Sequence, residues 1–151
     1  PQSNTGSGKG NLCLKTMPEI SRLIRPIRCR SKNLMKNRIN YDNRRFVSVS
    51  NSDNGEVGSA TVFHYRHEGD VVWATYRGGS IVFGSLIPKV DEGDGLDMRY
   101  QHLNSAGELM TGKCRSTPEI LPDGRLRLRE VWQWTTSDFS RGASVIEEVR
   151  D

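Results

Sequence analysis

The sequence from about Arg44 to Val149 predicts an all-β domain, an antiparallel meander of about eight strands that closes into an up-and-down barrel. Runs rich in Val, Ile, Thr, Tyr, Phe and Trp recur about every 10 to 15 residues, with turn-forming clusters between them. The links are short, so neighbouring strands must run antiparallel, because parallel crossovers need a dozen or more residues. Closure would remove both exposed edges. A curved sheet or a two-sheet sandwich is the alternative.

The predicted strands follow one another without any helical pattern after Arg44. They are residues 46–50, 59–66, 71–77, 80–89, 96–103, 108–115, 125–135 and 144–149. The clusters between them contain Gly, Asn, Asp and Pro, which bend the chain locally. Residues 116–124 contain Pro118 and Pro122, so we expect a stiff connection at the rim of the barrel.

The charge of the chain divides it into a tail, residues 1–34, and a single barrel domain, residues 35–151. The tail has seven Lys and Arg and one acidic residue, whereas the remainder has 15 basic and 17 acidic residues, so the net charge of +4 arises in the tail. We expect this tail to be disordered. We expect it to be either read-through upstream of a natural start at Met35 or, because it is rich in Arg and poor in acids, a transit-like segment.

Cysteine content and hydropathy predict where the domain resides. Only Cys114 lies in the predicted barrel, and one cysteine cannot form a disulfide within it, so we expect a cytoplasmic protein, with organellar targeting by the tail as the alternative. No run approaches the roughly 18 to 20 apolar residues of a spanning helix, so we expect a soluble protein with no membrane partner. A homodimer remains open.

Alternation is clearest in residues 125–135, where one set of side chains should point into the barrel. That set is Leu126, Leu128, Glu130, Trp132 and Trp134. A carboxylate among apolar side chains is costly unless it is paired, hydrogen-bonded or protonated, so Glu130 needs a partner. Arg99 and Arg115 are the candidates if they point inward, which alternation alone does not decide.

Small barrels are either filled by side chains or leave room for one small ligand. The predicted lumen has apolar walls and a few polar groups, which is typical of small-molecule pockets. Its candidate ligand-binding residues are Tyr76, Arg99, Tyr100, Arg115, Glu130, Trp132 and Trp134. The leading hypothesis is binding of a small anionic or polar-headed organic molecule. The alternative is that these side chains only pack against one another.

Two other function classes follow from the same residues. The second hypothesis is an enzyme, such as an isomerase or lyase using Glu130 with Arg115 or His102 as acid and base. The third and least favoured is nucleic-acid binding through the basic tail, with help from exposed Arg127 and Arg129, because the domain itself has a net charge of −2.

Metal and cofactor motifs are not apparent in the sequence. The three histidines, His64, His67 and His102, lack metal-ligand spacing, so we predict no metal site. The neighbours of Cys114 should point away from it, which predicts a buried structural thiol. Residues 6–10 fail as a phosphate-binding loop, and no cofactor is implied.

Several runs of the domain resemble a known group of proteins. The runs are Phe46 to Asn51, Val72 to Tyr76, Arg99 to Asn104, Gly112 to Glu119 and Trp132 to Thr135. Over nearly its whole length from Asn40, the domain resembles short, mostly bacterial proteins that commonly carry the label N-acetylglutamate synthase. That label implies an N-acetyltransferase. Common acetyltransferases hold acetyl-CoA at a glycine-rich turn that opens a helix. The sequence has neither feature, so we expect a calycin-like barrel instead.

Overall fold

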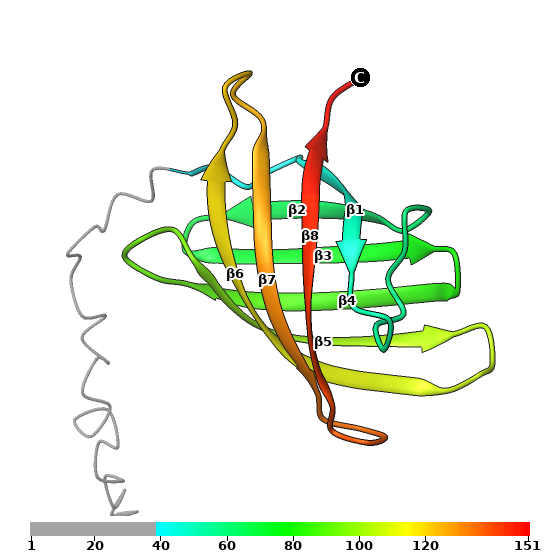
Figure 1. Ribbon diagram of the computed structural model, residues 1–151. Coiled ribbons are helices and arrows are strands. Elements are labelled where there is room, and N and C mark those ends of the chain that lie inside the picture. Colours follow the sequence, from blue (N-terminus) through cyan, green and yellow to red (C-terminus); the bar gives the residue numbers. More distant parts are fainter. Residues whose placement is uncertain (1–38) are drawn as a thin grey trace, which may run out of the picture. The chain divides into compact units, whose positions relative to one another are not determined.

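Each strand of this protein is hydrogen-bonded to the strand before it and the strand after it, and β8 pairs with β1 to close a barrel (Figure 1). The computed structural model describes residues 39–151. The strands are β1 (Arg45–Asn51), β2 (Val62–Glu68), β3 (Val71–Gly78), β4 (Ile81–Val90), β5 (Leu96–Asn104), β6 (Leu109–Ile120), β7 (Leu126–Trp134) and β8 (Arg141–Val149). The predicted closed antiparallel meander is confirmed, and the open sheet and the sandwich are excluded. The predicted tail, residues 1–34, lies outside the described residues.

The connection predicted at residues 116–124 is wrong, because β6 continues to Ile120 and the turn begins only at Leu121. Pro118 is tolerated inside this strand since it lies beyond Ser116, the last residue of β6 that pairs with β5. On its other side β6 stays paired with β7 as far as Ile120 opposite Leu126. Strand β8 also begins earlier than predicted, at Arg141, because its first residues pair with the end of β7.

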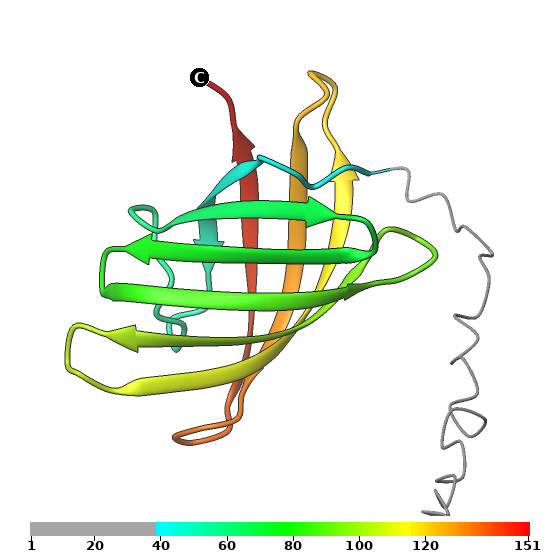
Figure 2. The same ribbon diagram turned by 180° about the vertical axis from the view of Figure 1, so that it is seen from behind.

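One end of the barrel is closed by packed apolar side chains. Tyr41, Phe46, Leu96, Leu128 and Ile146 are fully buried there. The chain that precedes β1 crosses this end (Figures 1 and 2), and the Tyr41 hydroxyl donates a hydrogen bond to the carbonyl of Asp94 at 2.6 Å. This end therefore forms a solid floor.

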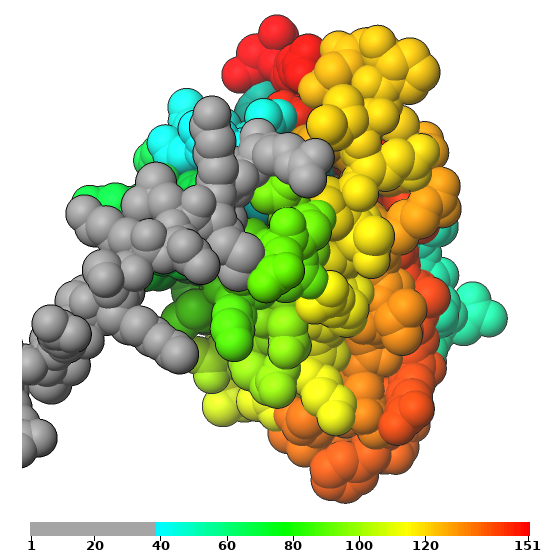
Figure 3. Space-filling model, turned by 90° about the vertical axis from the view of Figure 1, so that its left-hand side faces the viewer, coloured from blue at the N-terminus to red at the C-terminus, as the bar shows by residue number. Residues whose placement is uncertain are grey.

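The β6–β7 turn and the C-terminus lie side by side at the same end (Figures 1 and 3). Arg150 links them, because its guanidinium donates to the carbonyls of Asp123 and Gly124 at 3.2 and 2.7 Å. Arg44 adds an ion pair to buried Glu148 at 2.7 Å, across the β1–β8 seam. The closed end is thus held by charge-assisted contacts as well as by apolar packing.

The opposite end differs because β1 and β2 separate. They pair only from Arg45 to Val47, whereas β1 remains paired with β8 as far as Asn51. The long connection, residues 52–61, leaves the wall at this gap and contributes residues to the cavity lining at this end. We call this connection the mouth loop. No helix among residues 39–151 is long and apolar enough to cross a membrane.

Candidate functional site

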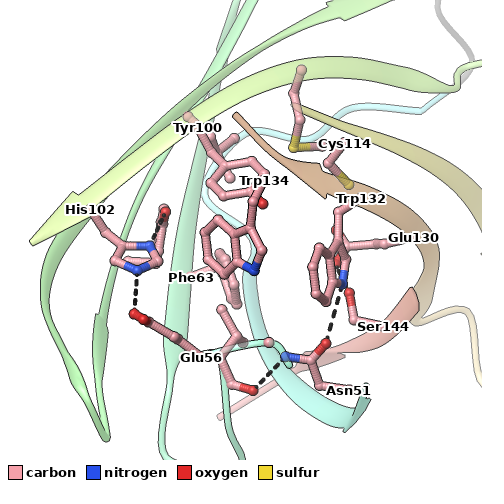
Figure 4. A pocket seen from close by; sticks show the side chains of 15 residues that line it. Asn51, Glu56, Phe63, Tyr100, His102, Cys114, Glu130, Trp132, Trp134 and Ser144 are labelled. Atoms are coloured by element: carbon pink, nitrogen blue, oxygen red, sulfur yellow. Dashed lines mark hydrogen bonds and ion pairs between the residues drawn. The ribbon is translucent and has the colours of Figure 1, made fainter. Parts of the chain in front are cut away.

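The barrel encloses a cavity between its floor and the mouth loop (Figure 4). The cavity has an empty volume of about 460 Å³, which includes the space at its opening to solvent. The lining combines apolar and aromatic walls with a few polar groups. The aromatic and polar residues of the lining are Asn51, Glu56, Phe63, Tyr76, Tyr100, His102, Cys114, Glu130, Trp132, Trp134 and Ser144. An aromatic, largely apolar lining with a few polar groups is typical of small-molecule sites.

Five of the seven predicted residues line this cavity, namely Tyr76, Tyr100, Glu130, Trp132 and Trp134. The inward face predicted for β7 is confirmed, since Leu126, Leu128, Trp132 and Trp134 are all buried. The aromatic rings pack against one another. The centroids of Trp132 and Trp134 are 5.5 Å apart, and those of Tyr100 and Trp134 are 5.7 Å apart at a steep interplanar angle. Such tilted and edge-on contacts fix ring orientation.

Glycines on neighbouring strands determine where three of these rings lie. The pairs, directly opposite in register, are Tyr76 with Gly84, Tyr100 with Gly112, and Trp132 with Gly142. A Cβ atom added to any of the three glycines would lie within 2.2 to 2.3 Å of the ring opposite. Because these glycines have no side chain, each ring packs directly against the backbone of the adjacent strand. The rings therefore stay close to the wall and leave the lumen open. Sequence reasoning missed this role, although Gly112 falls on the inward face of its strand.

Glu130 receives hydrogen bonds from two serines. Its Oε1 accepts from Ser116 Oγ at 3.0 Å and its Oε2 accepts from Ser144 Oγ at 2.7 Å. These serines lie directly opposite Glu130 on β6 and β8. Burial raises the pKa of Glu130 above its ordinary value, and the two serine hydrogen bonds oppose that shift. The carboxyl group lies deep in the barrel beside Trp132 (Figure 4) and still faces the cavity.

Arg99 and Arg115 do not partner Glu130, and the prediction that they point into the lumen is wrong. The Arg99 side chain is 68% exposed and pairs with Asp97 at 3.1 Å. The Arg115 side chain is 53% exposed and pairs with Asp91. On β5 and β6 the even-numbered residues, such as Met98 and Cys114, point into the barrel. The odd-numbered residues, which include Arg99 and Arg115, therefore face solvent.

His102 occupies the mouth of the cavity, on β5. Its side chain is only 1% exposed; Nδ1 lies 3.0 Å from the Tyr76 hydroxyl and Nε2 lies 2.8 Å from Glu56 Oε2. A carboxylate can only accept, so Nε2 carries a proton and donates to Glu56. Glu56 also accepts from Asn104 Nδ2 at 3.2 Å. Figure 4 shows Glu56 reaching His102 from the mouth loop.

The two indole N–H groups also bind the chain around the mouth loop. Trp132 Nε1 donates to Asn51 Oδ1 at 3.2 Å, and Trp134 Nε1 donates to the carbonyl of Asn54 at 3.1 Å. Asn51 Nδ2 in turn donates to the carbonyl of Val57 at 2.9 Å. Sequence reasoning missed Asn51 and Glu56, because both belong to a stretch that reads only as strand end and turn.

Two further polar groups lie near Glu130. Cys114 is buried as predicted, and burial followed by the charge of Glu130 raises its pKa far above the ordinary value, so it remains a thiol. The Tyr65 hydroxyl is buried and has no hydrogen-bond partner among the described residues. Burial and then Glu130 also raise the pKa of Tyr65. The deep end of the cavity is therefore lined by a carboxyl group and a thiol, and the Tyr65 hydroxyl is buried near them behind the lining.

The cavity lining contains two acids, Glu56 and Glu130, and one histidine, with no Lys or Arg among the described residues that form it. The expected anionic head would therefore find no fixed positive charge at the floor. Within residues 39–151 no group of three or more metal-binding side chains occurs. His64 is exposed, so it does not meet His102 inside the barrel.

Comparison with known proteins identifies the family. The family model described as Avidin-like protein matches residues 39–149, a range that includes all eight strands of the barrel. The chain belongs to this family. Comparison with curated proteins and with solved structures gave no match. The closed barrel of eight antiparallel strands agrees with an avidin-like protein, and nothing in the comparisons supports the label N-acetylglutamate synthase.

Proposed function

We propose that this avidin-like barrel binds one small organic molecule in its lumen. The observation that carries the proposal is Glu130, a carboxyl group that faces an aromatic cavity at its deep end while two serines hold it in place. Membership of a family that binds small ligands such as biotin supports the same function. A planar or apolar body would pack against Trp132 and Trp134, and a polar head would reach Glu130.

The chemistry of the floor indicates a head that donates hydrogen bonds. Each carboxyl oxygen of Glu130 accepts from one serine, and a carboxylate has about four acceptor sites, so acceptor capacity remains toward the cavity. Burial disfavours the ionised form of Glu130, and an N–H donor would stabilise it. Ureas, lactams, amidines and similar neutral or cationic heads fit this floor better than an anionic head.

Titration with small donors tests the proposal. The full chain is titrated with 2-imidazolidinone, 2-pyrrolidinone, benzamidine and biotin, followed by tryptophan fluorescence and calorimetry. We expect at least one to bind with a change in Trp132 and Trp134 emission, and Glu130→Ala to weaken it by about tenfold or more, since a hydrogen bond to a buried charge is lost. Val131→Ala, an exposed outward position on the same strand, should bind as the parent does. Absence of heat and of spectral change across the series would overturn the proposal.

No observation favours the other two functions. The acid–base pair of Glu130 and Arg115 does not form, because Arg115 lies on the outer surface. The outward arginines of β7 are engaged with carboxylates: Arg127 pairs with Glu147 at 2.6 Å and Arg129 pairs with Glu119 at 3.1 Å. These arginines therefore do not present a free basic face to a nucleic acid.

A further inference from the structure

A hollow on the outer surface of the barrel is lined mainly by basic side chains. It lies where β1 begins beside β2 and the end of β8 (Figure 1), and its empty volume of about 570 Å³ includes open solvent. Its charged and imidazole side chains are Arg44, Arg45, His64, Arg66 and Asp151, so three guanidinium groups and an imidazole face one carboxylate. The sequence from residue 35 onward has 17 acidic and 15 basic residues, so this concentration of positive charge is local.

Three of these side chains point outward from two neighbouring strands. Arg45 on β1 lies directly opposite His64 on β2. Arg66 lies two positions further along β2 on the same outward face, because Tyr65 between them is buried. Opposite and diagonal neighbours on paired strands have side chains roughly 5 to 8 Å apart at their base, so these three can reach one anion. Arg44 is not part of this donor set, because its guanidinium pairs with Glu148 at 2.7 Å.

Much of the hydrogen-bonding capacity of these three side chains is unused. The imidazole of His64 has no hydrogen-bond or ion-pair partner among residues 39–151. The Arg66 guanidinium makes only long contacts within that range, at 3.4 Å to Asn43 Oδ1 and 3.9 Å to Asp42 Oδ1. Arg45 pairs with Asp151, whose side chain is 92% exposed. The hollow therefore already accepts a carboxylate, and a side chain this exposed can leave by rotation.

An exposed tryptophan beside the hollow indicates what kind of anion fits. Trp73 on β3 lies directly opposite Arg66, on the same outward face, and 36% of the residue is exposed. An exposed indole next to basic side chains is the combination that binds a planar ring and the phosphate attached to it, because the ring stacks on the indole while the phosphate pairs with the guanidinium groups.

We propose that Arg45, His64 and Arg66 bind the phosphate group of an aromatic phosphate ester, such as a nucleoside monophosphate, whose ring packs against Trp73. A phosphate ester carries about two negative charges and three acceptor oxygens, so it pairs with both guanidinium groups and accepts from the imidazole. The Asp151 carboxylate carries one charge and is displaced. This site lies on the outer surface of the barrel and is independent of ligand binding in the lumen.

Titration with AMP and with ribose 5-phosphate tests the site, because the two differ in the planar base. The full chain is titrated by calorimetry at constant ionic strength, since salt screens exposed charges. We expect AMP to bind at least about fivefold more tightly than ribose 5-phosphate, because base–aromatic stacking contributes only for AMP. Trp73→Ala should remove this difference. Asp151→Asn should raise both affinities by about threefold, since an exposed carboxylate is a weak competitor.

A matched pair of double variants locates the phosphate. Arg45→Gln/Arg66→Gln should weaken both ligands by about tenfold or more, because two charge-assisted contacts are lost. Arg99→Gln/Arg115→Gln removes the same charge from exposed positions elsewhere on the barrel and should bind both ligands as the parent does. Absence of binding, equal losses in the two double variants, or an advantage of AMP that survives Trp73→Ala would overturn the proposal. Glu130→Ala should bind AMP normally, so failure of the lumen site is recognised separately.

Discussion

Replacing Gly142 by alanine tests whether Trp132 rests on the bare backbone of β8. The added Cβ would lie 2.2 Å from Cζ2 and 2.5 Å from Cη2 of the indole. Carbon atoms in ordinary contact stay about 3.5 to 4.0 Å apart, so the ring has to retreat by more than about 1 Å. The retreat moves the indole into the cavity and away from Asn51, whose Oδ1 accepts from its N–H at 3.2 Å.

The energetic cost has two parts. Overpacking costs about 1 to 3 kcal/mol, and the lost hydrogen bond costs about 1 kcal/mol. At roughly 4 °C per kcal/mol for a domain of this size, we expect Tm to fall by roughly 8 to 16 °C, with narrowing of the lumen and a changed tryptophan emission.

Thermal unfolding followed by circular dichroism measures the effect. Gly58→Ala is the control, because a Cβ at that position meets nothing within 4 Å, and it should unfold like the parent. If Gly142→Ala has the same Tm and the same emission spectrum as Gly58→Ala, Trp132 does not rest on Gly142 and the glycine explanation of the open lumen is wrong.

Three other substitutions give distinct outcomes. Burial raises the pKa of Glu130, so its contribution to stability is fully present below the ordinary pKa of 4.5 and is lost as the pH rises through the folded-state pKa. Over that pH range, Glu130→Gln should therefore gain stability relative to the parent. Parallel pH profiles of the two free energies of unfolding would contradict this. Tyr65→Phe removes a buried hydroxyl without a partner and should stabilise the ligand-free protein by about 1 kcal/mol in urea titrations, with a loss of stability as the contrary result. Arg115→Ala should change binding of any lumen ligand by less than about twofold in calorimetry, because its exposed ion pair with Asp91 lies outside the barrel; a larger loss would return Arg115 to the site.

Much of the candidate site was accessible from alternation alone. The period of two along β7 placed Leu126, Leu128, Glu130, Trp132 and Trp134 on one face, and the barrel buries that face. Alternation could not identify the partners of Glu130, because Ser116 and Ser144 become its neighbours only through the registers of β6 and β8 with β7. Alternation could not reveal the ring–glycine pairs for the same reason. Each pair consists of residues that lie opposite each other on neighbouring strands, and spacing along one strand does not show which residues these are.

The sequence by itself determined the strand order, the antiparallel sense and the inward face of β7, since these depend on side-chain period and on turn length, both local properties. Only the tertiary structure decided that β8 closes onto β1, that Arg99 and Arg115 face solvent, and that Glu56 reaches His102 across 46 positions of sequence. Closure and register are set by contacts between residues far apart in the chain, and the mouth loop reaches the cavity at the end where β1 and β2 no longer pair, beyond Val47.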